Sequence, residues 1–202
     1  MSPRRRQQDR TRATRLALMA AARPLFAERG YAAVSAEEIV AAAGLTRGAL
    51  RHHFGDKKAL FRAVFEELER EMTERVAAAI AGAGDSWTAA ITGLTAFLDA
   101  CQDPEVLRIA LVDAPAVLGW ADWRAVEADQ GLGLIIAGLD QAMAEGVFAP
   151  QPVEVLAHLI LSAVIEAALL IARAPDPARA RADAEQTLLA LLTGLRHDRS
   201  DA

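Results

Sequence analysis

The chain has 202 residues, of which 53% are hydrophobic and 24% charged, and it contains one cysteine, Cys101. A hydrophobic content this high excludes a disordered chain, and a single cysteine excludes a disulfide framework and a cysteine-based structural zinc site. The net charge of −5, taken over the whole chain, argues against a nucleic-acid partner.

The charge is divided unequally along the chain. Residues 1–60 carry 12 lysines and arginines against 5 acidic residues, whereas residues 61–202 carry 10 against 22. We therefore expect two domains, a basic one over 1–60 and an acidic one over 61–202. Only the basic domain is expected to contact a polyanion.

Apolar residues recur at helical spacing, and strict alternation of apolar and polar residues is hard to find. This pattern predicts an all-α protein of about nine helices. The expected helices cover residues 14–29, 36–43, 46–53, 57–81, 87–102, 104–112, 120–145, 152–173 and 177–195. The polar tails, 1–9 and 196–202, are expected to be mobile.

Local signals mark several of these helix ends. Ser35 and Glu38 have the spacing of a capping box, so a helix should begin after Ser35. Gly44 suits the left-handed position that ends this helix, and Thr46 suits the N-cap of the next one. Pro24 removes a backbone donor inside the first helix and predicts a kink there.

The stretch 35–54 has the form of a helix-turn-helix. Its apolar residues are spaced to pack the two helices against the first one: Ile39, Val40, Leu45, Leu50 and Phe54. The outward face of the second helix then consists of Thr46, Arg47, Gly48, Ala49, Arg51, His52 and His53. Small residues allow close approach and arginines supply positive charge, as a recognition helix in a major groove requires. An ordinary αα-hairpin with a solvated basic face would show the same pattern.

Residues 14–64 closely resemble the DNA-binding domain of the tetracycline-repressor (TetR) family. The resemblance rests on residues 26–31 (FAERGY), 43–50 (AGLTRGAL) and 52–54 (HHF). It implies that the protein is a DNA-binding transcriptional regulator with a three-helix helix-turn-helix head and a helical body.

The resemblance also implies which residues contact DNA. The set is Thr14, Ser35, Thr46, Arg47, Gly48, Ala49, Arg51, His52, His53 and Lys57. The threonines would bond phosphates, the start of the second helix would face base edges or backbone, and the histidines with the lysine would hold phosphates. Arg51 stands where the family usually has Tyr, so the base code cannot be carried over. Lys58 replaces a usual Glu and adds positive charge.

The residues before the first expected helix are rich in arginine. Arg4, Arg5, Arg6 and Arg10 suit an arm that follows the minor groove or the DNA backbone. A solvated tail would have the same composition, so both interpretations stand.

The apolar segment 153–172 carries a line of polar residues, His158, Ser162 and Glu166, spaced four residues apart. Buried polar groups must be paired, so this line predicts either a self-satisfied seam, including one across a subunit interface, or the wall of a ligand cavity. With Glu154, the segment holds three ionisable groups, which disfavours a membrane span.

Other side chains between the middle helices are candidates for the same cavity. They are Phe97, Cys101, Asp113, Trp120, Trp123 and Arg124. Tryptophan and cysteine are also common core residues, so an ordinary packing role is the alternative.

The family resemblance implies that the last two long helices pair across a two-fold axis. The residues expected at that interface are Leu161, Ile165, Leu188, Leu189, Leu192 and Leu195. The resulting expectation is a cytoplasmic homodimer that represses at a palindromic operator and is released by a small hydrophobic or amphipathic effector. No catalytic constellation, cofactor, metal site, membrane contact or targeting segment is expected. A DNA-binding dimer without an effector and, less favoured, an α-helical enzyme using His158 and Glu166 remain alternatives.

Overall fold

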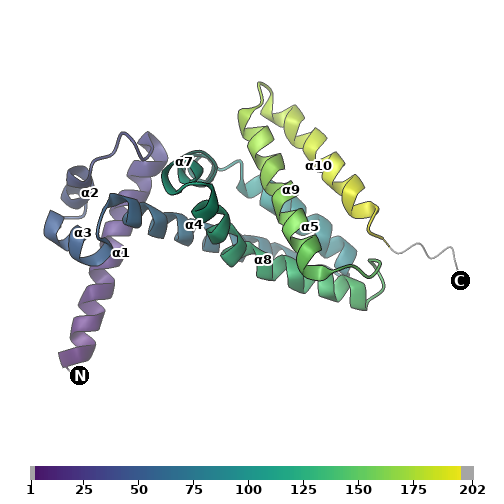
Figure 1. The fold of residues 1–202 in the computed structure, drawn as a ribbon, viewed down its shortest axis with the longest axis horizontal. Coiled ribbons are helices and arrows are strands. Elements are labelled where there is room, and N and C mark those ends of the chain that lie inside the picture. The colour runs from purple at the N-terminus through teal and green to yellow at the C-terminus, as the bar shows by residue number, and fades with distance from the viewer. Residues whose placement is uncertain (1–2, 197–202) are drawn as a thin grey trace, which may run out of the picture. The chain divides into compact units, whose positions relative to one another are not determined.

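The structure, a computed structural model, describes the backbone of residues 3–196 and the side chains of residues 7–196. Its elements are shown in Figure 1. In chain order they are α1 (Pro3–Arg29), α2 (Ala36–Ala42), α3 (Arg47–Phe54), α4 (Lys57–Ile80), α5 (Ser86–Ala100), α6 (Pro104–Val106), the π-helix η1 (Leu107–Asp113), α7 (Ala114–Leu118), α8 (Trp120–Ala144), α9 (Val153–Arg173) and α10 (Pro177–Thr193). The described range contains no strand, only an isolated bridge between Phe148 and Arg196. The predicted all-α fold is confirmed.

The first helix is longer than the sequence pattern indicated. α1 begins at Pro3, so the expectation of a mobile tail is wrong over residues 3–9. Proline is well tolerated in the first helical turn, and the arginines and glutamines that follow it are good helix formers. The helix also continues through the exposed Pro24.

The segment expected to be one helix over 104–112 is composite. It runs through α6, the π-helical turns of η1 and then α7, as far as Leu118. Gly119 ends it with a φ of +90°, a backbone conformation that residues with a side chain rarely adopt. The breaker was recognisable in the sequence, but the π-helical hydrogen bonding was not.

The chain divides into two compact units. Unit 1 comprises the residues up to Leu68 together with Pro104–Trp123, and unit 2 comprises Glu69–Asp103 and the residues from Arg124 onward. Segment 104–123 therefore packs with the helix-turn-helix, although it lies far from it in sequence.

The core of unit 1 is built around an aromatic cluster. The ring of Phe61 lies 5.2 Å from that of Phe26 and 5.1 Å from that of Tyr31, both edge-on. Residues from the helix-turn-helix join the same core: Ile39, Val40 and Leu50 are buried, as the spacing predicted.

In unit 2, α9 packs against α5 and α10, and α9 and α10 lie side by side (Figure 1). α9 is long and apolar enough to cross a membrane on length and composition alone. It nevertheless contributes eight buried residues to this unit, among them Leu161, Val164 and Ile165. These contacts place one face of α9 in the core of unit 2 and favour a packed helix over a membrane span.

Candidate nucleic-acid interface and ligand cavity

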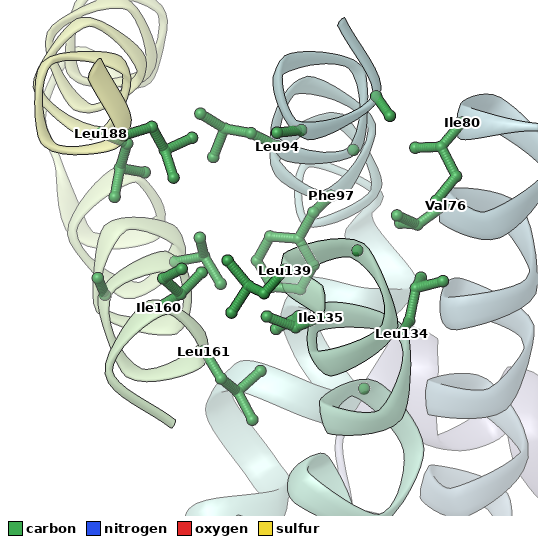
Figure 2. Close-up of a pocket in the computed structure, with 18 of the residues that line it drawn as sticks. Val76, Ile80, Leu94, Phe97, Leu134, Ile135, Leu139, Ile160, Leu161 and Leu188 are labelled. Atoms are coloured by element: carbon green, nitrogen blue, oxygen red, sulfur yellow. The ribbon is translucent and has the colours of Figure 1, made fainter. Parts of the chain in front are cut away.

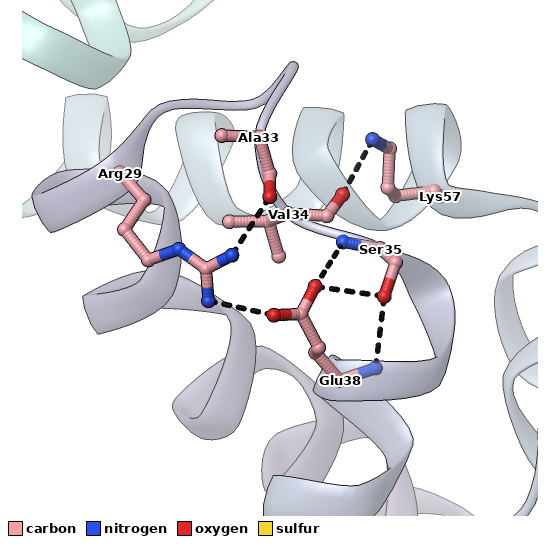
Figure 3. Close-up of polar contacts among 6 residues, drawn as sticks. All are labelled: Arg29, Ala33, Val34, Ser35, Glu38 and Lys57. Atoms are coloured by element: carbon pink, nitrogen blue, oxygen red, sulfur yellow. Dashed lines mark hydrogen bonds and ion pairs between the residues drawn. The ribbon is translucent and has the colours of Figure 1, made fainter.

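The helix-turn-helix begins with the predicted capping box. The Ser35 Oγ accepts a bond of 3.2 Å from the Glu38 amide, and the Glu38 carboxylate accepts bonds of 2.8 Å from the Ser35 amide and hydroxyl (Figure 3). The bonds from Ser35, with Arg29 at 2.7 Å, lower the pKa of Glu38 to about 2. The charged carboxylate thus fixes the start of α2.

The Ser35 hydroxyl makes both of its hydrogen bonds within the capping box. Both its donor and its acceptor function are used there, so the predicted DNA contact through this side chain, which stays a prediction, would compete with the cap. A hydroxyl carries only one proton, and here Glu38 accepts it.

α3 starts after a tight turn, as predicted. Gly44 has a φ of +64°, and the Thr46 Oγ1 caps α3 by accepting from the Ala49 amide at 3.2 Å. Thr46, Arg47, Gly48, Arg51 and His52 are exposed on α3 and at its N-cap, whereas Ala49 and His53 are half-buried. The small and basic residues therefore lie at the surface, where they can meet DNA.

Arg47 already has a partner in the free protein. Its Nη1 lies 2.7 Å from the Glu37 Oε1, and both side chains are well exposed. Exposed pairs of this kind are weak, so the guanidinium can exchange Glu37 for a phosphate or a base.

Lys57, for which a phosphate contact is predicted, binds two backbone carbonyls in the free protein. Its Nζ donates to the backbone carbonyls of Tyr31 at 2.9 Å and Val34 at 2.7 Å, and it lies 3.9 Å from the centre of the Tyr31 ring. The half-buried ammonium thus ties the α1–α2 connection to the start of α4 (Figure 3).

Arg15 orients α3, a role that sequence patterning missed. Its Nη1 donates to the His53 carbonyl at 2.7 Å, and its guanidinium lies 4.2 Å from the centre of the Phe54 ring. An arginine near the end of a basic stretch gives no sequence signal for this role. The half-buried Thr14 neighbours it on α1, and the side chains of Arg4, Arg5 and Arg6 lie outside the described residues.

Segment 104–118 is held to α1 and to the α1–α2 connection by charged groups. Arg23 pairs with Glu105, and Asp113 accepts a bond of 2.7 Å from the Tyr31 amide while it contacts Arg108 at 3.4 Å. A Cβ built on Gly30 would lie 1.9 Å from the Arg108 Nη2, so the guanidinium occupies the space of the missing side chain.

An apolar cavity with a volume of about 510 Å³ lies within unit 2. Its walls come from α4, α5, α8, α9 and α10, and Figure 2 shows labelled side chains from all five. The residues labelled there are Val76, Ile80, Leu94, Phe97, Leu134, Ile135, Leu139, Ile160, Leu161 and Leu188. The volume and the apolar walls match those of sites that enclose drug-sized molecules.

Phe97 lines this cavity as predicted, but the other candidates for it do not. Asp113, Trp120 and Trp123 belong to unit 1, where Asp113 binds the Tyr31 amide and the two tryptophan rings lie 4.9 Å apart. Cys101 is buried at the C-cap of α5, outside the cavity wall. The sequence pattern grouped these residues as candidates for one cavity, but it could not show in which unit each of them would pack.

The polar line on α9 also lies away from the cavity. His158, Ser162 and Glu166 are exposed, and the Ser162 Oγ accepts a bond of 3.0 Å from Arg124 and donates one of 2.8 Å to the His158 carbonyl. Their i, i+4, i+8 spacing identified one face of the helix correctly, but that face is turned outward.

Most of the residues predicted for the dimer interface pack within unit 2 in the single chain, and their part in an interface stays a prediction. Leu161, Ile165 and Leu188 are buried within the single chain, and Leu189 is half-buried. Leu192 and Leu195 are half-buried and line the cavity together with Leu161 and Leu188. The exposed apolar side chains of α9 and α10 are Val155, Leu159, Leu170 and Leu191.

A pair of carboxyl groups stands out in the cavity wall. Glu69 is 4% exposed and Glu127 is 5% exposed, and burial together with the charge of Glu127 raises the pKa of Glu69 well above its ordinary value. The Glu69 Oε1 has no hydrogen-bond partner among the described residues. The sequence contains many glutamates on amphipathic helices, and nothing in the pattern distinguished these two.

Two family profiles match the chain. Residues 18–64 match the profile described as bacterial regulatory proteins, tetR family, and residues 87–195 match a tetracyclin repressor-like C-terminal domain.

Individual proteins show the same likeness. The chain is 27% identical over 160 residues to the transposon Tn10 TetC protein of Escherichia coli, covering 79% of this chain and 81% of that one. It is 44% identical over 82 residues to the HTH-type transcriptional regulator CymR of Pseudomonas putida, 40% of each chain. The solved structure of a TetR-family transcriptional regulator from Pectobacterium atrosepticum superposes with a TM-score of 0.83 at 39% identity, covering 93% of this chain and 96% of that one.

Proposed function

Because the chain belongs to the tetracycline-repressor (TetR) family of DNA-binding transcriptional regulators, we propose that it is a homodimeric repressor released from its operator by a small ligand. The observation that carries this proposal is the apolar cavity of about 510 Å³ in unit 2. Such a volume suits a hydrophobic or amphipathic effector.

The DNA-binding surface is proposed to be the exposed face of α3. Arg47 and Arg51 bring two positive charges to it, and Gly48 leaves room for close approach to a base edge or a phosphate. Two copies of this face related by a two-fold axis would read a palindrome in successive major grooves.

The dimer interface is proposed to use the outward face of α9 and α10. Val155, Leu159, Leu170 and Leu191 are each about 60% exposed in the single chain. Apolar side chains concentrated on two adjacent helices favour a protein–protein contact, and a second copy would cover them.

The switch is proposed to be a shift between two populations of the dimer. A ligand that binds better to a form with altered spacing of the two α3 helices would draw the protein away from the operator. Ligand and DNA then weaken each other's binding by the same factor, as thermodynamic linkage requires. The protein would act in the cytoplasm, where its operator lies.

Operator release is tested by fluorescence anisotropy on labelled DNA from upstream of the protein's own gene. We expect salt-sensitive binding that a panel of hydrophobic and amphipathic compounds reverses, and that the same compounds raise the melting temperature of the free protein. Compounds that raise the melting temperature without releasing DNA would contradict the effector mechanism. A protein that does not bind this DNA at about 100 mM salt would contradict autoregulation at this site.

The interface is tested by a charge on the exposed face of α9. Leu170→Glu, at an exposed position of α9 that does not line the cavity, should convert the dimer to monomers and weaken operator binding, with mass measured by light scattering during gel filtration. Val112→Glu is the matched control, because Val112 is also half-exposed but lies in unit 1. A Leu170→Glu protein that remains dimeric would contradict the proposed interface.

A further inference from the structure

The cavity contains one polar group that its apolar wall does not satisfy. Glu69 lines the cavity beside Met72 and Thr73, and its side chain is almost wholly removed from solvent. Its Oε1 has no hydrogen-bond partner within the described part of the chain. A buried oxygen without a donor is costly, and it is rare in native proteins outside functional sites.

The charged side chains that line the cavity near Glu69 are acidic. Glu127 lines the same cavity, and its Oε2 lies 3.8 Å from the Arg124 Nη1. Arg124 is half-buried, also donates to Ser162, and is not itself part of the cavity wall. Arg124 thus contacts Glu127, whereas the Glu69 Oε1 lacks a donor among the described residues, and a positive charge would be stabilised next to Glu69.

We propose that the cavity takes a hydrophobic cation, an amine or quaternary ammonium on an apolar body, with its charged group against Glu69. This inference rests on the proposed function, which makes the cavity the effector site. Burial favours the protonated form of Glu69, so binding of a cation would favour its ionised form and release its proton to solvent. Ion pairing in a water-poor site would then satisfy the carboxylate, and the leucine-rich walls would bury the apolar body.

The composition of the wall disfavours the other classes of ligand. Among the described residues that line the cavity none is Lys, Arg or His, so an anion would meet only Glu69 and Glu127. A pure hydrocarbon would leave the Glu69 oxygen unsatisfied. Ser86, Gln141 and Thr73 are the uncharged polar side chains that line the cavity, and Ser86 and Gln141 each donate one bond to Glu145.

The test uses three probes of similar shape on the full-length protein, measured by isothermal titration calorimetry. They are (4-phenylbutyl)trimethylammonium, its neutral carbon isostere (5,5-dimethylhexyl)benzene, and the anion 5-phenylpentanoate. For the unmodified protein we expect the cation to bind at least about tenfold more tightly than the anion, about 1.4 kcal/mol. An anion that binds as tightly as the cation would overturn the proposal without any variant.

Glu69→Gln isolates the charge. We expect it to weaken binding of the cation about tenfold or more and to change the affinity for the neutral isostere less than twofold. Glu74→Gln is the matched control, because Glu74 lies on the same helix but is exposed and paired with Arg70. Equal losses for cation and isostere in Glu69→Gln, or no loss for either, would overturn the proposal.

Failure of this inference is distinct from failure of the proposed function. Binding of the cation that depends on Glu69 but leaves DNA bound would support the inference and contradict effector release. Release of DNA by neutral compounds, with no dependence of cation binding on Glu69, would contradict the inference and leave effector release standing.

Discussion

Arg23 on α1 and Glu105 on α6 form a double hydrogen bond across 82 positions of sequence. The Arg23 Nε lies 2.8 Å from Oε1 and the Nη2 lies 2.8 Å from Oε2, with both side chains about one quarter exposed. This fork geometry is the strongest arrangement available to an arginine and a carboxylate. It fastens the first helix of the DNA-binding segment to segment 104–118.

We expect this pair to contribute measurably to stability. In a double-mutant cycle of Arg23→Ala and Glu105→Ala, the coupling should be about 1 kcal/mol from urea unfolding at fixed protein concentration. Arg70 and Glu74, exposed and four residues apart on α4, form the control pair, with an expected coupling of about 0.3–0.5 kcal/mol. A coupling for Arg23 and Glu105 no larger than that of the control pair would contradict the prediction.

Gly30 should be intolerant of a side chain for two separable reasons. Its φ is +77°, and a Cβ would displace the Arg108 guanidinium. Gly30→Ala should therefore cost about 1 kcal/mol more than Gly44→Ala, where φ is also positive but no atom lies within 4 Å of the added Cβ. In an Arg108→Ala background this difference should disappear, which thermal unfolding can measure. If it persists there, the guanidinium is not the obstacle.

In each half-site of the operator, the Arg51 side chain should contact either a phosphate or a guanine. If it contacts a phosphate, Arg51→Ala should lower the slope of log affinity against log salt by about 1.8, because the proposed dimer would carry two copies and each phosphate contact contributes about 0.9. If it reads a guanine, the operator's advantage over unrelated DNA should fall instead. Arg179→Ala, an exposed arginine of unit 2, is the control and should change neither quantity.

The buried Glu69 should make stability depend on pH. Its pKa is raised in the folded protein, so between its unfolded value near 4.5 and its folded value the native state holds more protons than the unfolded state. Stability contributed by this group is therefore present at low pH and is lost as pH rises through the folded pKa. Each pKa unit corresponds to about 1.4 kcal/mol.

Glu69→Gln should consequently be more stable relative to the unmodified protein at pH 8 than at pH 5. Glu127 and Arg124 remain in this variant, and so do Cys101 and Arg75, so pH dependence that arises from them should persist. Urea unfolding at both pH values measures the difference, and Glu74→Gln should show none. A Gln variant whose relative stability is the same at both values would contradict the raised pKa.

The helices were predictable because their ends are encoded locally. Ser35, Glu38, Gly44 and Thr46 each act through bonds or dihedral angles within a few residues, and each behaves in the structure as its spacing predicted. The start of α1 was not predictable from the apolar pattern. Residues 3–13 are helical, and the side chains of residues 7–13 are all exposed, so no core face marks them.

The site was less accessible to sequence reasoning because it depends on how helices rotate against one another. Periodicity placed His158 and Ser162 on one face of α9 and Leu161 on another, but it could not show which face met the core. Lys57 looked like a phosphate contact because its charge was visible, whereas the two carbonyls that hold it are visible only in three dimensions. The burial of Glu69 in the cavity wall could not be predicted from the sequence for the same reason.

The buried cysteine can serve as a reporter of local opening in unit 2. Cys101 is the only cysteine in the chain, and burial, with the charges of Glu69 and Glu127, raises the pKa of its thiol far above the usual range. A thiol reagent can therefore modify it only when unit 2 opens around the end of α5. The labelling rate then measures how often unit 2 opens there, and no engineered cysteine is needed. A compound that fills the neighbouring cavity would lower this rate.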